Sequence, residues 1–312
     1  MAKSRTLEKT IRIGTRESQL ALWQAHTVEK KLNDLGYKTE IVKVKSEGDI
    51  ILDKPLYELG ITGVFTKTLD IALINGTIDI AVHSMKDVPT ALAKGVVQTA
   101  VLERHNPNDI LVFNENTEFL NHKKAIIATG SLRRKAQWLN RYPNHEITDL
   151  RGNVNTRLQK LKDNGWNGAI FAQAGLERID VKPENNIVLD WMIPAPSQGA
   201  VVVVCMENNS SCKEATEKLN HKQTEICTHV ERDFLRILEG GCTAPIGALA
   251  EIKEDKISFK GVLLSLDGKE KIEIKKTVDI SDYYTLGKIV AQEVLSNRGK
   301  KLMEEIKKRL SE

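Results

Sequence analysis

Long apolar stretches are absent from this 312-residue chain, which is 41% hydrophobic and only 5% aromatic. No run of about 18 apolar residues occurs, so no segment is long enough to span a membrane as a helix. Residues 1–10 are polar and lack the apolar centre of a signal peptide. We therefore expect a cytoplasmic protein that does not associate with membranes.

Cysteine is scarce as well. The four cysteines are Cys205, Cys212, Cys227 and Cys242. They form no Cys-x-x-Cys pair and have no companion histidine at zinc-site spacing. His83 could join Asp87 as a metal ligand, but no third ligand has a fitting spacing. We expect no bound metal and no structural disulfide bond.

A strong excess of charge is also missing. Lysine and arginine number 46 against 42 aspartate and glutamate residues, and an excess of four is too small to indicate nucleic acid as a partner. Neither a Gly-x-x-x-x-Gly-Lys loop nor a Gly-x-Gly-x-x-Gly fingerprint is present, which argues against a nucleotide.

What the sequence does contain is an alternation of strand and helix patterns, typical of an α/β fold with largely parallel sheets. Strands are predicted at 11–15, 39–45, 77–82, 109–113, 125–129, 147–150, 169–172 and 200–206, and helices at 18–35, 65–74, 132–141 and 154–162. Residues 46–63 form a long irregular stretch, typical of a functional loop or lid. After Asn220 the pattern changes to one helix, three strands and a final helix, which predicts a separate α+β domain.

Arginine recurs where predicted strands open into helices, at Arg16, Arg133, Arg134, Arg151 and Arg157. Ligands of open α/β sheets bind outside those strand ends, where helix N-termini attract anions. Guanidinium groups suit carboxylates because their planar fork binds two oxygens at once. Each arginine alone is most simply a surface residue or part of an ion pair, but their shared position favours a polycarboxylate site.

Two further residues stand out. Cys242 follows Gly240 and Gly241 at the end of a predicted helix, where it is either a small buried residue after a helix stop or a functional thiol. Asp87 is a carboxylate among cations. It is either an ion-pair partner of Lys86 or a helix cap, or a group that stabilises positive charge on a ligand and moves a proton.

Five motifs in one order carry a resemblance. They are Arg16, His83–Pro89, Ser131–Arg134, Leu150–Leu158 and Leu238–Cys242. With them, the sequence from about Ile11 to Pro245 resembles the porphobilinogen deaminase (hydroxymethylbilane synthase) family. The resemblance implies a transferase of tetrapyrrole and heme biosynthesis that condenses four porphobilinogen molecules into hydroxymethylbilane with release of ammonia, and that acts as a monomer.

The resemblance also implies roles for single residues. Asp87 would be catalytic, and Cys242 would hold a dipyrromethane cofactor through a thioether. The other cofactor-binding positions are Lys86, Ser84, Ser131, Arg133, Arg134, Thr129 and Gly175. The substrate-binding positions are Arg16, Ser18, Gln19, Arg151, Arg157, Arg178 and Gln198.

The family fold implies two hinged domains like those of periplasmic binding proteins and a small C-terminal α+β domain. We expect domain 1 at 1–103 plus 197–219, domain 2 at 104–196 and domain 3 at 220–312. Three positions depart from the family pattern: Thr62 replaces a lysine in the lid, Gly130 a serine and Ser197 a glycine.

Porphobilinogen chemistry agrees with these residues. Each ring brings an acetate and a propionate, which calls for many arginines. Loss of ammonia leaves a cationic azafulvenium, which a carboxylate such as Asp87 can stabilise. Two alternatives stay open: a non-catalytic anion-binding protein, which gives Cys242 and Asp87 no role, and a cysteine acyl transferase, which needs a histidine base that His229 does not obviously supply.

Overall fold

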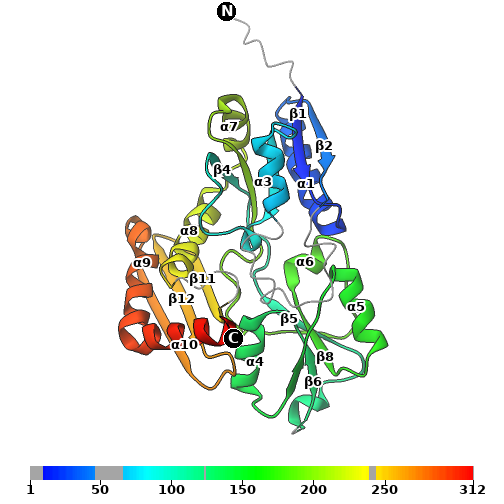
Figure 1. Ribbon diagram of the computed structural model, residues 1–312, viewed down its shortest axis with the longest axis vertical. Helices are drawn as coiled ribbons and strands as arrows, with labels where there is room; N and C mark the ends of the chain where they lie inside the picture. Colours follow the sequence, from blue (N-terminus) through cyan, green and yellow to red (C-terminus); the bar gives the residue numbers. More distant parts are fainter. Residues whose placement is uncertain (1–9, 46–65, 123, 239–243, 312) are drawn as a thin grey trace, which may run out of the picture. The chain divides into compact units, whose positions relative to one another are not determined.

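The computed structural model describes residues 10–45, 66–122, 124–238 and 244–311 and divides the chain into two compact units. Of these residues, the first unit contains 10–45, 66–104 and 200–225, and the second contains 105–122, 124–199, 226–238 and 244–311. Figure 1 labels their helices and strands.

The strands are β1 (Ile11–Thr15), β2 (Thr39–Lys43), β3 (Ile80–Ser84), β4 (Val96–Val101), β5 (Asp109–Phe113), β6 (Ile126–Ala128), β7 (Glu146–Thr148), β8 (Gly168–Ala172), β9 (Asn186–Val188), β10 (Val201–Met206), β11 (Ile246–Lys253), β12 (Lys256–Leu264) and β13 (Lys271–Asp279). The α-helices are α1 (Gln19–Asp34), α3 (Lys67–Ile74), α4 (Leu132–Arg141), α5 (Val154–Asp163), α6 (Gln173–Glu177), α7 (Ser210–Glu217), α8 (Lys222–Ile237), α9 (Tyr283–Val294) and α10 (Lys300–Ser311).

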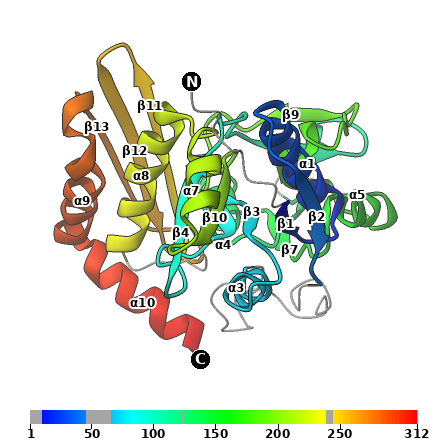
Figure 2. The same ribbon diagram turned by 90° about the horizontal axis from the view of Figure 1, so that it is seen from above.

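The first unit is built on a five-stranded sheet with the order β2-β1-β3-β10-β4. β1 pairs in parallel with β2 and β3, whereas β10 is antiparallel to β3 and β4. Four of the five strands therefore share one direction. Ala25, Val28 and Leu32 of α1 pack on one face together with α7, and Leu69 and Leu73 of α3 pack on the other. Figure 2 shows α1 and α3 on opposite sides of the sheet.

The second unit contains a sheet with the matching order β7-β6-β8-β5-β9. β6 is parallel to β7 and β8, and β5 is antiparallel to β8 and β9, so again only one strand is reversed. Leu161 of α5 and Leu176 of α6 pack on one face, and Trp138 of α4 packs on the other.

The same unit includes the antiparallel sheet β11-β12-β13. Its core contains residues of α8, α9 and α10, with the rings of Phe234 and Phe259 at 5.0 Å, and Figure 2 shows α9 and α10 beside the sheet. Ala136 of α4 packs against Val262 and Leu264 of β12. The C-terminal sheet is thereby anchored to the helix that follows β6.

These elements confirm the predicted α/β fold with two mostly parallel sheets and a small C-terminal α+β part. Helix α4 has the predicted bounds, and the other predicted elements within the described residues shift by a few residues at most. β4, β9, α6 and α7 were not predicted, and the single helix predicted at the end of the chain is two helices, α9 and α10. The predicted lid at 46–63 lies outside the described residues, and the three domain boundaries stay a prediction.

Candidate active site

The first cluster of predicted residues lies at one edge of the first unit's sheet. β1 and β3 are parallel neighbours, with Ile13 opposite Ile80 and Gly14 opposite Ala81, so their C-terminal ends meet at the same edge. β1 leads into Arg16, Ser18 and Gln19, and β3 ends at Ser84 and leads into Lys86 and Asp87. The structure thus brings together six residues that the sequence placed in two separate motifs.

Local hydrogen bonds order the side chains at this edge. Ser18 caps α1, because its hydroxyl accepts a hydrogen bond from the Ala21 amide. Gln24, which is buried on α1, donates from Nε2 to the Ser84 hydroxyl at 2.7 Å. Ser18 therefore fixes the start of α1, and Gln24 of the same helix fixes the Ser84 side chain.

Lys86 and Asp87 belong to a short 3-10 turn, Met85–Asp87. Met85 is 2% exposed, and its amide donates to the carbonyl of Ala200. Burial of Met85 fixes the turn, while Lys86 and Asp87 stay half-buried. The Asp87 carboxylate and the Lys86 ammonium group are therefore both accessible to a ligand.

His83 precedes this turn on β3 and is 6% exposed. Burial lowers the pKa of His83 to about 4, and the charge of Arg16 lowers it further in the same direction. The imidazole is therefore neutral at pH 7. Among the described residues, no group of three or more His, Cys, Asp or Glu side chains is placed to hold a metal ion.

The second cluster lies at the corresponding edge of the second unit's sheet. The parallel strands β6, β7 and β8 lead into Thr129–Arg134, Arg151 and the α6 segment with Gly175 and Arg178. β5 runs the other way, and its first residue, Asp109, pairs with Ala172 at the end of β8. One buried carboxylate thereby joins the predicted basic residues.

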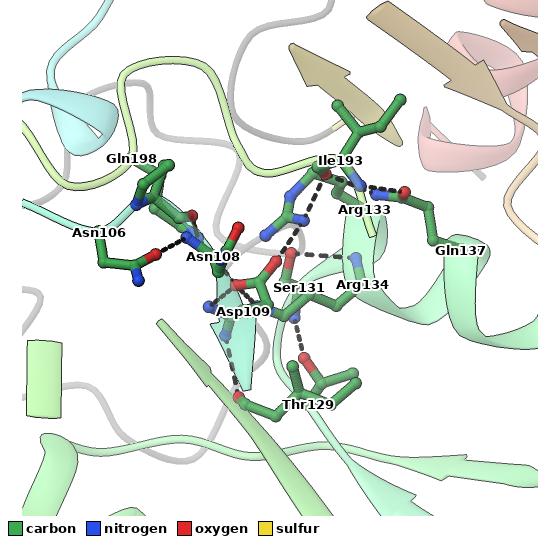
Figure 3. Close-up of polar contacts among 12 residues, drawn as sticks. Asn106, Asn108, Asp109, Thr129, Ser131, Arg133, Arg134, Gln137, Ile193 and Gln198 are labelled. Carbon is green, nitrogen blue, oxygen red and sulfur yellow. Dashed lines mark hydrogen bonds and ion pairs between the residues drawn. The ribbon is translucent and has the colours of Figure 1, made fainter. Parts of the chain in front are cut away.

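Asp109 is 0% exposed and binds both predicted cofactor arginines (Figure 3). Arg133 donates from a terminal nitrogen to Asp109 Oδ2 at 2.7 Å, and Arg134 donates from Nε and a terminal nitrogen to Oδ1 at 3.0 and 2.7 Å. Burial alone would raise the pKa of Asp109, but the charges of the two arginines outweigh it and hold that pKa well below its ordinary value.

The start of α4 sets the positions of these arginines. Ser131 caps the helix by accepting from the Arg134 amide, and the buried Thr129 hydroxyl accepts from the Ser131 amide. Arg133 also donates to the carbonyl of Ile193, and Arg134 to that of Ile170. The two guanidinium groups are therefore fixed by backbone contacts as well as by Asp109.

Gln198 and Arg178 meet on the segment that precedes β10. Gln198 is 1% exposed and donates from Nε2 to the Pro107 carbonyl and to Asp109 Oδ1. Arg178 donates to the Gly199 carbonyl, and burial lowers the pKa of Arg178 to about 10, a shift that Glu177 opposes. Both predicted substrate residues are thus part of a buried hydrogen-bond network.

Arg151 and Arg157 flank the start of α5. Asn153 caps this helix by accepting from the Thr156 amide, and Arg157 donates from Nε to the Gly152 carbonyl at 2.7 Å. Arg151 is 8% exposed, and burial lowers its pKa, although Asp149 acts in the opposite direction. Gly152 has φ +110°, which favours glycine at this turn.

Comparison with known proteins gives two matches to family models. Residues 11–214 match the model described as porphobilinogen deaminase, dipyromethane cofactor binding domain. Residues 225–296 match porphobilinogen deaminase, C-terminal domain. The chain belongs to the porphobilinogen deaminase family.

Individual relatives agree with the membership in the porphobilinogen deaminase family. A probable porphobilinogen deaminase of Methanocaldococcus jannaschii is 42% identical over 278 residues, covering 87% of this chain and 94% of that protein. The porphobilinogen deaminase of Carboxydothermus hydrogenoformans is 39% identical over 313 residues, covering 98% and 100%. A probable amino-acid ABC transporter extracellular-binding protein from Bacillus subtilis has a TM-score of 0.43 at 14% identity. The match covers 68% of this chain and 90% of that protein and is too weak to bear on function.

The porphobilinogen deaminase family was predicted from motifs, and that prediction is confirmed. Cys242 and Thr62 lie outside the described residues. At Gly130, one of the three predicted departures from the family pattern, an added Cβ would lie 2.7 Å from the Leu150 carbonyl oxygen, so a serine there requires a backbone shift. Asp109 was missed, although an acidic residue opening an apolar strand was a visible signal.

Proposed function

We propose that this protein is a hydroxymethylbilane synthase, a transferase that joins four porphobilinogen molecules head to tail. Each condensation breaks the carbon–nitrogen bond of an aminomethyl group, releases ammonia, forms one carbon–carbon bond to the free α-carbon of the terminal pyrrole and removes the proton of that carbon. The observation that carries the proposal is the match of both family models, in order, along this chain. Membership in the family and the basic strand ends support one and the same reaction.

Substrate binding falls to the basic residues. Porphobilinogen carries an acetate and a propionate, and a guanidinium group can bind both oxygens of a carboxylate. Arg16 in the first unit and Arg151, Arg157 and Arg178 in the second follow sheet strands at their C-terminal ends, where ligands of such sheets bind. We assign them to substrate carboxylates, with Ser18, Gln19 and Gln198 as polar neighbours.

The residues present fit the family's dipyrromethane cofactor. Its acidic side chains match the basic residues Lys86, Arg133 and Arg134. Ser84, Thr129 and Ser131 lie within four residues of them in the sequence, and Gly175 lies in α6, after β8. Arg133 Nε is buried and has no hydrogen-bond partner in the described part of the chain, which leaves a donor for such a group. Cys242 would hold the cofactor by a thioether. When bound, the dipyrromethane supplies the free pyrrole carbon from which the chain grows.

Asp87 is the proposed catalytic carboxylate. A carboxylate beside the pyrrole nitrogen stabilises the cation left after loss of ammonia and can accept and return the proton of that nitrogen. No hydrogen bond or ion pair of the Asp87 side chain is found among the residues that the structure describes. Its two oxygens are therefore available to a ligand.

Further expectations accompany this function. We propose a monomer in the cytoplasm with porphobilinogen as its partner and no nucleic acid, and three domains with the boundaries given above. Within the described residues, no helix has both the length and the apolar character needed to cross a membrane.

The covalent cofactor is tested by the mass of the intact protein. We expect purified protein to exceed its sequence mass by two pyrrole units, and Cys242→Ser to have the sequence mass and no activity. An active wild-type protein without the adduct would contradict the cofactor assignment. An anion-binding protein without enzymatic function would show neither adduct nor bilane production.

Asp87 is tested by Asp87→Asn, with Asp34→Asn as a control because Asp34 is an exposed aspartate of the same unit. Loss of the carboxylate should lower kcat by at least about 100-fold, the usual range for a general acid–base group, without changing the melting temperature. Bilane formation near the wild-type rate in Asp87→Asn would remove this residue from the mechanism.

A further inference from the structure

We propose that Asp109 is a positioning residue that holds Arg133, Arg134 and Gln198 as one preassembled anion-binding group. This proposal rests on the function proposed above. The group combines three parts of the second unit: the first residue of β5, the first turn of α4 and the segment before β10. Residues 24, 25 and 89 positions away converge on a single carboxylate.

The division of hydrogen bonds within the group is unequal. Asp109 Oδ1 accepts from Arg134 twice and from Gln198 once, at 2.7 to 3.0 Å, whereas Oδ2 accepts from Arg133. Arg134 is engaged through all three of its nitrogens, including a bond to the Ile170 carbonyl. Arg133 is engaged through one terminal nitrogen only, which contacts Asp109 and Ile193.

Arg133 consequently carries the donors that remain. The Arg133 side chain is only 5% exposed, and its Nε is buried without a hydrogen-bond partner in the described residues. A buried donor without an acceptor costs about 1 to 3 kcal/mol, so an incoming carboxylate oxygen would relieve that cost. Asp109 thus fixes one side of the Arg133 guanidinium and leaves the other side for a ligand.

Charge and positioning predict opposite effects when Asp109 is replaced. The two guanidinium groups and the carboxylate sum to a net charge of +1, and Asp109→Asn would raise this to +2. If Asp109 only offset positive charge, the variant would attract acidic pyrroles more strongly. If Asp109 positions the arginines, the variant binds them more weakly despite the greater positive charge, because two neighbouring cations then repel each other and lose their common acceptor.

The experiment follows covalent loading of cofactor-free protein, produced in cells that make no porphobilinogen. Porphobilinogen is added, and intact mass records the gain of two pyrrole units with time. We expect Asp109→Asn to load at least about tenfold more slowly than wild type and to need a higher porphobilinogen concentration for half the maximal rate. Asp163→Asn is the matched control, because Asp163 is exposed in the same unit and contacts none of the three residues.

A second comparison keeps the proposal testable if Asp109→Asn does not fold. Arg134→Gln leaves Arg133 with Asp109 at net charge zero, and the double variant Asp109→Asn/Arg134→Gln leaves Arg133 alone at +1, without two adjacent buried cations. Positioning predicts slower loading in the double variant than in Arg134→Gln. Equal or faster loading in either comparison would overturn the role of Asp109. Failure of wild-type protein to gain mass would instead overturn the proposed function and this inference with it.

Discussion

His83 shows at the scale of one residue how burial sets charge near the proposed catalytic turn. The imidazole lies on β3 after Val82 and opposite Val202 of β10, and burial lowers its pKa from the ordinary value of 6.5 to about 4. Between these two values the unfolded chain binds a proton that the folded chain does not. The free energy of unfolding must therefore decrease as the pH falls from about 6.5 towards 4.

His83→Gln is expected to remove this part of the pH dependence. Between pH 7 and pH 5 the wild type should lose roughly 2 kcal/mol more stability than the variant, given 1.36 kcal/mol per pKa unit. Urea unfolding at a series of pH values measures the difference. His26→Gln is the control, since His26 is exposed on α1. Parallel stability curves for wild type and His83→Gln would show that His83 is not the titrating group.

Ser197, a predicted departure from the family pattern, lies in an unfavourable environment. Its φ is +64°, in the left-handed region where a glycine is favoured, and its hydroxyl oxygen is buried without a hydrogen-bond partner in the described residues. A backbone hydrogen bond offsets this unfavourable conformation, because the Ser197 amide donates to Glu231 at 2.6 Å. The strained residue is thus held in place by a carboxylate on another element.

At the scale of elements, Glu231 connects three parts of the second unit. Its side chain is 0% exposed on α8, and it accepts from the Ser197 amide through one oxygen and from the Ala250 amide of β11 through the other. Ser197 directly precedes Gln198, which reaches Asp109. Glu231 therefore links α8 and β11 to the segment that supplies Gln198, one of the proposed ligand-binding residues.

Glu231→Gln should weaken the hydrogen bonds between α8, β11 and the segment at Ser197. An amide keeps one acceptor oxygen and places an NH₂ group against a backbone N–H donor, so we expect a loss of about 1 to 3 kcal/mol in the free energy of unfolding, measured by urea denaturation. Glu225→Gln, a change on the partly exposed part of the same helix, should cost less than 1 kcal/mol. Equal losses in both variants would contradict a specific link through Glu231.

The elements also show how far sequence reasoning reaches. α4 was predicted with its observed bounds, and the N-cap Ser131 marks its start in the sequence. α7 was missed because Cys212 and Ala215 are its only buried apolar residues, too few for a periodic pattern. β9 was missed because it is a three-residue edge strand. Short elements depend on tertiary pairing, which local sequence does not reveal.

The same limit applies to the candidate site. The predicted strand ends indicated where Arg133 and Arg151 would lie, because the C-terminal ends of parallel strands share one edge of the sheet. The sequence did not predict that Arg133 and Arg134 share a buried carboxylate, since Asp109 is 24 residues away and belongs to a reversed strand. Contacts between distant elements, rather than motifs, decide which donors a ligand can use.

At the scale of the whole molecule, the two five-stranded sheets repeat one arrangement. Each has a single reversed strand in the fourth position, β10 in the first sheet and β5 in the second. Each reversed strand is the first one formed after the chain passes from one unit to the other, near residues 104–105 and 199–200. The reversed direction in each sheet thus accompanies the exchange of the chain between units.

The thiols of the complete chain give a count that tests the cofactor anchor independently of activity. Cys205, Cys212 and Cys227 are buried, and burial raises the pKa of the Cys205 thiol to about 11. In guanidinium chloride all exposed thiols react, so cofactor-free protein should show four reactive thiols and cofactor-loaded protein three, because a thioether survives denaturation. Cys242→Ser should also show three, whether or not it was exposed to porphobilinogen. Four reactive thiols in denatured, fully loaded protein would place the attachment on a group other than cysteine. Loaded Cys212→Ser should show two reactive thiols, because Cys242 still holds the cofactor, and a count of three would contradict attachment through Cys242.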